Sequence, residues 1–317
     1  MSASHRRRIG RWPIAALLAL TLFVTGFAVV EGNVLNMGER WDRWTARIGM
    51  IIDPPPDRST LPTVVVPATT APAATPTPDP TPTATTEPSA TPQPTPTPIP
   101  REPVDLALVE DHETVFASQL TTEDCAVAAT QMVLAILGLG DTSQAFQQEI
   151  KDRIGEWESR QDSLNGGWGP SAVGLALAAY GADDYEVRAY ETYPDALRAS
   201  AVAITELDKP VVMFPWWGAH SWVMTGYRAD ADATLFDDAE ITGAYILDPW
   251  YPRVSSIWGP SDRPGTFEDL GELERNWPAF QGPPGYESIG PGWTRPEGAY
   301  PDRDGRFLIL VPTTPRG

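Results

Sequence analysis

The sequence predicts an α+β domain in residues 104–317, a segment of 214 residues that is long enough to bury a full core. Three observations predict it. Apolar residues recur at helical spacing through residues 125–137, which is typical of a helix. Two short apolar stretches, 210–214 and 220–227, flank a glycine-containing turn and so predict a pair of strands. A third apolar stretch, in GAYILDPW, predicts a strand that ends at Asp248.

The composition divides the chain into five segments. They are a basic tail (1–12), an apolar segment (13–30), a juxtamembrane segment (31–53), a Pro/Thr-rich linker (54–103) and the acidic domain (104–317). The acidic domain carries 14 Lys and Arg residues against 34 Asp and Glu residues, a net charge of −20. This charge argues against nucleic acid and anionic lipid as partners of the domain, because both would be repelled.

The apolar segment 13–30 is an uncharged run of 18 residues that follows four arginines. A spanning helix needs about 20 apolar residues, and flanking positive charge stays in the cytoplasm. The sequence therefore predicts a single-pass anchor in the cell membrane, with the N-terminus cytoplasmic and the domain extracellular. The alternative is a cleaved signal peptide, with Gly26 and Ala28 as the small residues of the cleavage site and a secreted product.

The linker 54–103 holds 17 of the 34 prolines and alternates them with threonine, as in TPTPDPTPT. Such a composition cannot build a core and favours extended polyproline conformation. At about 3.1 Å per residue it predicts a semi-rigid spacer of up to roughly 150 Å. We expect it to hold the domain away from a membrane.

Cys125 is the only cysteine of the chain, so no internal disulfide is available to an exported domain. It falls where the polar turn TTED becomes the apolar helix, and Gly138 predicts the helix end. The free N–H groups and positive dipole of a helix N-terminus favour thiolate over thiol. A buried structural cysteine among alanines is the alternative, and position alone leaves both open.

The chain has three histidines, of which one belongs to a predicted apolar strand. His5 lies in the basic tail, and His112 lies among acidic residues, which predicts a solvated position. His220 begins the stretch 220–227, and a period of two places it on the same strand face as Trp222. A sheltered imidazole can act as a base at neutral pH. The alternative is a core histidine bonded to a backbone carbonyl.

Asp248 ends the next predicted strand, in LDPW. In a hairpin or meander, the end of that strand lies beside the start of the strand that begins at His220. A carboxylate there could orient the imidazole ring and stabilise its protonated form. The alternative is that Asp-Pro simply begins a turn.

Together these segments resemble the papain-like cysteine peptidases, in particular the bacteriocin-processing peptidases of family thirty-nine, which cleave after double-glycine leaders. Three motifs carry the resemblance, in the order Cys, His, Asp. The stretch QLTTEDCAVAATQMVL has Gln119 six residues before Cys125, KPVVMF…GAHSWVMTGY is similar to the family's strand pair, and AYILDPW is similar to its strand ending in Asp-Pro.

The resemblance implies a papain-like fold, with the nucleophile at the N-terminus of a central helix packed on an antiparallel sheet that carries the histidine and the aspartate. It also implies a role for each matching position. Cys125 would be the nucleophile, His220 the base and Asp248 the group that orients the histidine. Gln119 would stabilise the oxyanion of the tetrahedral intermediate.

The expected activity is that of an extracellular, membrane-tethered peptidase acting on a peptide or protein substrate. A substrate associated with the cell wall is one option. No ATP-binding cassette follows in this chain, so neither bacteriocin export nor double-glycine cleavage is carried over. A peptidoglycan amidase or acyl transferase on the same fold, and a non-catalytic surface binding module, are the alternatives. No cofactor is predicted, and no His/Cys/carboxylate cluster has the spacing of metal ligands.

Overall fold

The structure is a computed structural model that describes residues 56–69, 99–159, 161–162, 168–255, 257–280 and 300–317, with single positions 26, 37, 41, 45, 48 and 52 before them. Within this part of the chain the strands form one eight-stranded sheet and a two-stranded ribbon. The sheet contains β1 (Thr63–Val66), β2 (Val104–Ala107), β3 (Tyr185–Tyr190), β4 (Val211–Met213), β5 (Trp222–Ala229), β6 (Ile241–Leu247), β9 (Thr266–Asp269) and β10 (Phe307–Pro312). The ribbon pairs β7 (Val254–Ser255) with β8 (Gly259–Pro260).

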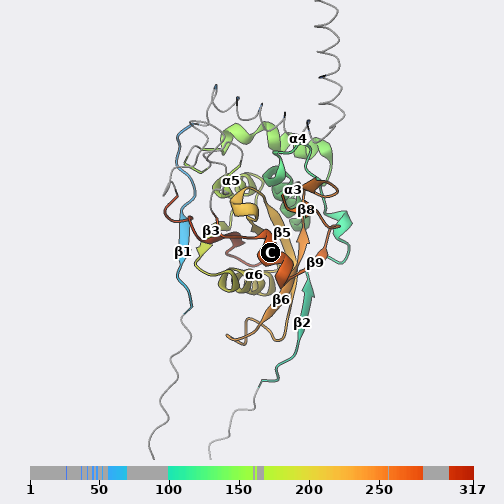
Figure 1. Cartoon of the computed structure of the whole chain (residues 1–317), viewed down its shortest axis with the longest axis vertical. Coiled ribbons are helices and arrows are strands. Elements are labelled where there is room, and N and C mark those ends of the chain that lie inside the picture. The colour runs from blue at the N-terminus through green and yellow to red at the C-terminus, as the bar shows by residue number, and fades with distance from the viewer. Residues whose placement is uncertain are drawn as a thin grey trace, which may run out of the picture.

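The strand order of the sheet is β1-β3-β10-β4-β5-β6-β9, and β2 pairs with the second half of β5. Among the described strands, β1 and β3 are the parallel pair, and the other pairings are antiparallel. The approach of β2 to β5 depends on Gly226, because a Cβ atom there would lie 2.1 Å from the carbonyl oxygen of Leu106. Strands β1 and β2 lie on opposite sides of the domain (Figure 1).

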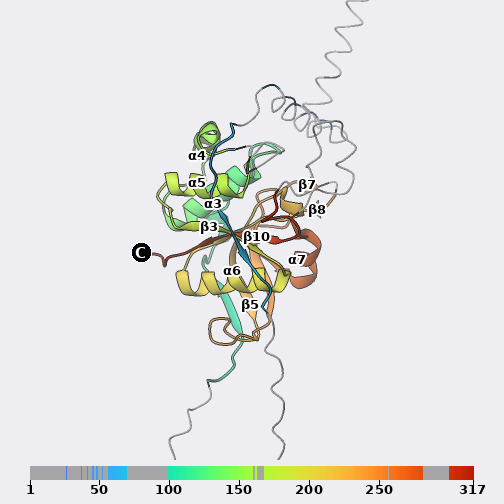
Figure 2. The same ribbon diagram turned by 90° about the vertical axis from the view of Figure 1, so that its left-hand side faces the viewer.

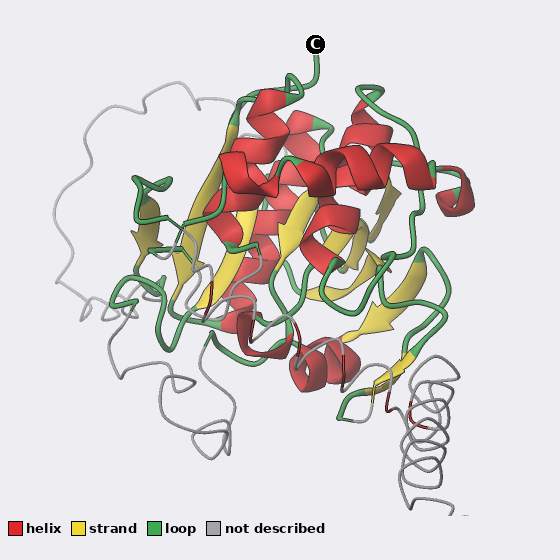
Figure 3. Ribbon diagram, turned by 90° about the horizontal axis from the view of Figure 1, so that it is seen from above, coloured by secondary structure: helices red, strands yellow, loops and turns green. Residues whose placement is uncertain are grey.

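Helices cover both faces of the sheet (Figure 2), and Figure 3 shows the helices of one face in front of the strands. On one side lie α3 (Cys125–Leu137), α4 (Gln144–Asp152) and α5 (Pro170–Ala179), and on the other side lies α6 (Tyr193–Leu207). The short helix α7 (Leu270–Asn276) follows β9 and contacts it and β6. The described chain therefore combines helices with a large sheet, as the sequence predicts.

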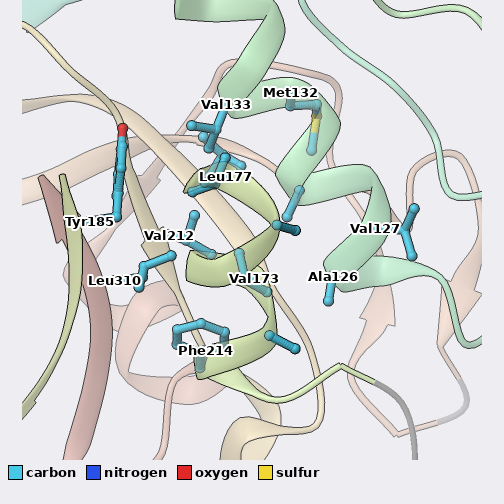
Figure 4. Close-up of a cluster of buried hydrophobic side chains, with 14 of the residues drawn as sticks. Ala126, Val127, Met132, Val133, Val173, Leu177, Tyr185, Val212, Phe214 and Leu310 are labelled. Carbon is cyan, nitrogen blue, oxygen red and sulfur yellow. The ribbon is translucent and has the colours of Figure 1, made fainter. Parts of the chain in front are cut away.

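Two buried apolar clusters make up the core, one on each side of the sheet. In the first, Met132 of α3 and Leu177 of α5 belong to the same cluster as Val212 of β4 (Figure 4). In the second, Ile204 of α6 belongs with Met224 of β5. Because both faces are covered, β4 is buried and apolar at all three positions and does not alternate.

One stretch of the predicted linker 54–103 belongs to the sheet. Residues 63–66, inside that linker, form β1 and belong to the sheet. The Arg303 guanidinium donates to Thr63 Oγ1 at 3.0 Å, and the Ser171 hydroxyl donates to the Leu61 carbonyl at 3.2 Å. The run TVVV is a short edge strand in proline-rich surroundings, so composition concealed it. Residues 70–98 lie outside the described residues.

The predicted localisation in the cell membrane is also corrected. Within the described residues, no helix has the length and apolar character that crossing a bilayer requires. The longest described helix, α6, has 15 residues, fewer than the about 20 that the hydrocarbon core demands. This finding contradicts the predicted single-pass anchor. The segments 1–12, 13–30 and 31–53 lie outside the described residues, apart from the single positions given above.

Candidate active site

Cys125 is the first residue of α3 and is partly exposed. Its position agrees with the predicted helix, which ends at Gly138 in the left-handed conformation at φ 74°. The N-cap residue Asp124 does not cap the helix with its side chain. Its carboxylate instead accepts from the Thr121 N–H at 2.9 Å and from Lys151 Nζ at 2.8 Å. The side chain of Asp124 therefore does not occupy the first-turn N–H groups of α3.

His220 lies in the segment that joins the 3₁₀ turn η4 (Trp216–Gly218) to β5, and it is 2% exposed. Its Nε2 lies 2.6 Å from Asp248 Oδ1, which leaves Nδ1 as the ring nitrogen available to another partner. The prediction that His220 and Trp222 share a face is wrong. Trp222 packs in the core on the α6 side, whereas His220 interacts with Cys125 on α3, because the 3₁₀ turn interrupts the period of the strand.

Opposing effects set the charge of His220. Burial lowers the pKa of its imidazole, but the negative charge of Asp248, its hydrogen bond and the contact with Cys125 outweigh burial and raise the pKa to about 9. The ring is consequently protonated at neutral pH. This differs from the neutral base that burial alone predicts. The sequence does not show whether the carboxylate raises the pKa of the imidazole more than burial lowers it.

Trp216 stacks on the catalytic candidate His220, with ring centroids 4.0 Å apart and an interplanar angle of 15°. Trp216 also stacks with Trp258, with ring centroids 5.9 Å apart, and Trp217 packs on Trp258 as well. Trp216 and Trp217 have φ angles of 54° and 59°, in the left-handed region that side chains with a Cβ rarely adopt. Such strain is retained where the surrounding structure fixes it. No pattern in the sequence predicts this geometry.

Asp248 follows the last residue of β6 and is mostly buried. Its Oδ1 accepts from His220 and also from the Trp250 backbone N–H at 2.8 Å, which orients the carboxylate. The turn after Asp248 is bonded to the segment before Cys125. The Gln119 N–H donates to the Pro249 carbonyl at 2.9 Å, and the Ser118 hydroxyl donates to the Tyr251 carbonyl at 2.6 Å.

Gln119 is buried, and its side chain turns towards its own loop. Nε2 donates to the Thr121 carbonyl at 2.7 Å, while Oε1 is buried without a hydrogen-bond partner in the described chain. An amide nitrogen carries two protons, so one N–H is committed to Thr121 and the second is free for another acceptor. The structure thus places Gln119 in the loop that precedes Cys125, with one donor engaged.

Arg253 is a neighbour of the site that sequence reasoning missed. Its guanidinium donates to the Leu120 carbonyl at 3.1 Å and to the Thr121 carbonyl at 3.3 Å, and it lies over the Trp250 ring. It therefore joins the segment before the cysteine to the segment after the aspartate. Its position in the chain, in WYPRV, carries no periodic signal.

Two groups outside this site behave differently from the expectation. His112 is half-buried and not solvated: its Nε2 lies 2.9 Å from Thr225 Oγ1, and burial lowers the pKa of its imidazole.

In the described residues, carboxylate oxygens of Asp262, Glu268 and Glu272 lie within 4.8 Å of one another. Burial and the Glu272 carboxyl raise the pKa of Glu268 to about 9, so this group is protonated at neutral pH and offers a cation less charge than three carboxylates would.

Comparisons with known proteins find few similarities. No protein family model matches this chain, and no curated protein is similar to it. Among solved structures, it is similar to a double glycine motif protease from an AMS/PCAT transporter, crystallised in complex with the leader peptide. The identity is 18%, the match covers 62% of this chain and 91% of that chain, and the TM-score is 0.31. A similarity at this level supports no conclusion about this protein, so its function must be inferred from the site.

Proposed function

We propose that this protein is a cysteine peptidase, a hydrolase that cleaves amide bonds through an acyl-thioenzyme on Cys125. The observation that supports it is the contact of buried His220 with two groups: the Asp248 carboxylate at 2.6 Å and the Cys125 thiol. The proposal includes a papain-like fold, in which the helix that begins with the nucleophile packs on the sheet next to the histidine and the aspartate.

In the resting site His220 carries a proton, so Cys125 faces an imidazolium. The positive charge and the N-terminus of α3 both stabilise negative charge on the sulfur. Asp248 holds the imidazolium by its Nε2–H and prevents rotation of the ring. Trp216 shields this hydrogen bond from water and places its π face against the cation.

Acylation begins when the Cys125 thiolate attacks the carbonyl carbon of the scissile amide. A C–S bond forms, and the carbonyl π electrons move onto oxygen. The backbone N–H of Cys125 and the second N–H of Gln119 are the donors proposed for this oxyanion. The C–N bond then breaks as His220 transfers its Nδ1 proton to the leaving amine.

Deacylation uses one water molecule. Neutral His220 accepts a proton from the water, whose oxygen attacks the thioester carbonyl. Collapse of the second tetrahedral intermediate breaks the C–S bond, releases the carboxylic acid and restores the Cys125 thiolate beside the His220 imidazolium.

The test is alkylation of the full chain by iodoacetamide at pH 6, followed by intact mass. Because Cys125 is the only cysteine, a single added carbamidomethyl group reports it without ambiguity. The wild type is expected to react at least about 10-fold faster than free cysteine, since only about 0.3% of an ordinary thiol is ionised at that pH.

His220→Ala should react no faster than free cysteine, and Cys125→Ala should not be labelled. A pool of quenched fluorescent peptides then tests hydrolysis, which Cys125→Ala should abolish. Slow wild-type alkylation that His220→Ala leaves unchanged would contradict the proposal.

A further inference from the structure

Gln147 is a buried polar residue on α4 that the proposed mechanism does not use. It is 2% exposed, and its side chain makes three hydrogen bonds. Oε1 accepts from the Leu120 N–H at 2.8 Å. Nε2 donates to the Ser118 carbonyl at 3.1 Å and to Gln131 Oε1 at 2.8 Å.

These bonds reach the residues on both sides of Gln119. Gln147 binds the carbonyl before it and the N–H after it, while the N–H of Gln119 itself donates to Pro249. The backbone of the oxyanion-donor candidate is thus fixed at three consecutive positions. Two of the three bonds come from one side chain, and that side chain belongs to a different helix from the one that carries Cys125.

A second buried amide fixes the orientation of Gln147. Gln131, on α3, is fully buried and donates through Nε2 to the carbonyls of Asp141 and Ser143, at 2.9 Å and 2.8 Å. Its Oε1 is therefore directed at Gln147 as an acceptor. Every amide proton of the two glutamines is bonded, and exchanging N and O in Gln147 would set a donor against the Leu120 N–H. A fully satisfied buried network of this kind holds one geometry.

We propose that Gln147 is a positioning residue for the oxyanion donor: it holds the backbone on both sides of Gln119, so that the second amide N–H of Gln119 meets the developing oxyanion. The inference rests on the proposed function. It predicts an effect on steps that create an oxyanion and no effect on steps that do not.

Two reagents separate these steps on the full chain. p-Nitrophenyl acetate acylates a thiolate through a tetrahedral oxyanion, with loss of p-nitrophenolate, whereas iodoacetamide alkylates it by displacement at a saturated carbon. Gln147→Met removes all three hydrogen bonds at similar volume. Since one oxyanion donor contributes on the order of 10²–10³ in rate, misplacing it should slow the acylation burst by about 10-fold or more. The alkylation rate should stay within about twofold of the wild type.

The matched control is Gln148→Met, the next residue on α4, which is exposed and bonds to Asp152. It should leave both rates unchanged. A double mutant tests whether Gln147 acts through Gln119. In the Gln119→Ala background, Gln147→Met should slow acylation no further, because the donor that it positions is already absent. Should Gln147→Met fail to fold, Gln131→Met tests the same network from its far end and should slow acylation selectively by a smaller factor.

The outcomes distinguish this inference from the proposed function. Slow alkylation and no acylation burst in the wild type would mean that the proposed function is wrong. A reactive wild type with Gln147→Met equal to it, or slowed equally with both reagents, would overturn the inference alone. Effects of Gln119→Ala and Gln147→Met that multiply in the double mutant would do the same.

Discussion

The indole of Trp216 lies flat against the imidazole of His220, with ring centroids 4.0 Å apart. The backbone conformation at this contact is unfavourable, since Trp216 and Trp217 both adopt positive φ before Gly218 at φ 85°. The turn therefore brings a π face to the one imidazole of the site, and a cation over such a face is stabilised by about 1 kcal/mol or more when water is excluded.

Replacing the stacked ring should lower the pKa of His220. For Trp216→Leu we expect a decrease of about 1, because 1.36 kcal/mol corresponds to one pKa unit. The pH dependence of iodoacetamide alkylation measures it as a shift of the imidazolium limb to lower pH. Trp217→Leu is the matched control, since Trp217 shares the positive φ and the Trp258 contact of Trp216, whereas Trp216 stacks on His220. Equal profiles for the two variants would show that the stack does not act on the imidazole.

Asp248→Asn should reduce hydrolysis while leaving the turn intact. The asparagine keeps an Oδ1 acceptor for the Trp250 N–H but loses the charge that helps raise the pKa of His220. We expect kcat/KM to fall on the order of 10²-fold or more, the size of a lost acid–base contribution. Steady-state hydrolysis measures it, and circular dichroism checks the fold. Activity within twofold of the wild type would remove Asp248 from the mechanism.

His220 should also make stability depend on pH. Its pKa is about 9 in the folded state and about 6.5 in the unfolded chain, so folding favours the protonated ring. The stabilisation is complete below pH 6.5 and is lost as pH rises through 9. Relative to His220→Gln, the wild type should lose up to about 3 kcal/mol of unfolding free energy between pH 6 and pH 9.5. Urea denaturation at both pH values tests it, and a constant difference between the proteins would contradict it.

Strand β1 should contribute to stability although it lies inside the predicted linker 54–103. A chain that starts at residue 104 lacks β1. Arg303 and Ser171 then lose the hydrogen bonds that they donate to Thr63 and Leu61. Compared with a chain that starts at residue 56, it should lose about 3 kcal/mol of stability, which corresponds to a Tm lower by roughly 6–12 °C. Calorimetry of the two chains measures the difference. Equal Tm values would show that β1 adds nothing to the fold.

Part of the site could be predicted because each residue stands at the edge of a regular element. The helical spacing after Cys125 and the apolar strand before Asp248 are local patterns, and a hairpin brings the end of one strand to the start of the next. The contact between His220 and Asp248 follows from that geometry.

What could not be predicted depends on contacts between distant segments. The pairing of β1 with β3 joins residues more than 100 positions apart, and a four-residue strand has too little periodicity to stand out. The charge of His220 depends on how far burial lowers its pKa and how far the Asp248 carboxylate raises it, and that balance is set by the folded structure. No local sequence pattern predicts the role of Gln147, because its three hydrogen-bond partners come from two other segments of the chain.

The position of β1 changes what the Pro/Thr-rich stretch can do. Residues 69 and 99 both belong to the described domain, and β1 and β2, on either side of the stretch, are strands of one sheet. Residues 70–98 consequently connect two segments of the same domain. Their contour length cannot set the distance between the domain and the segment that precedes β1. That distance is measured from Arg58, which bonds to Ser159 and to the carbonyls of Glu156 and Gly155.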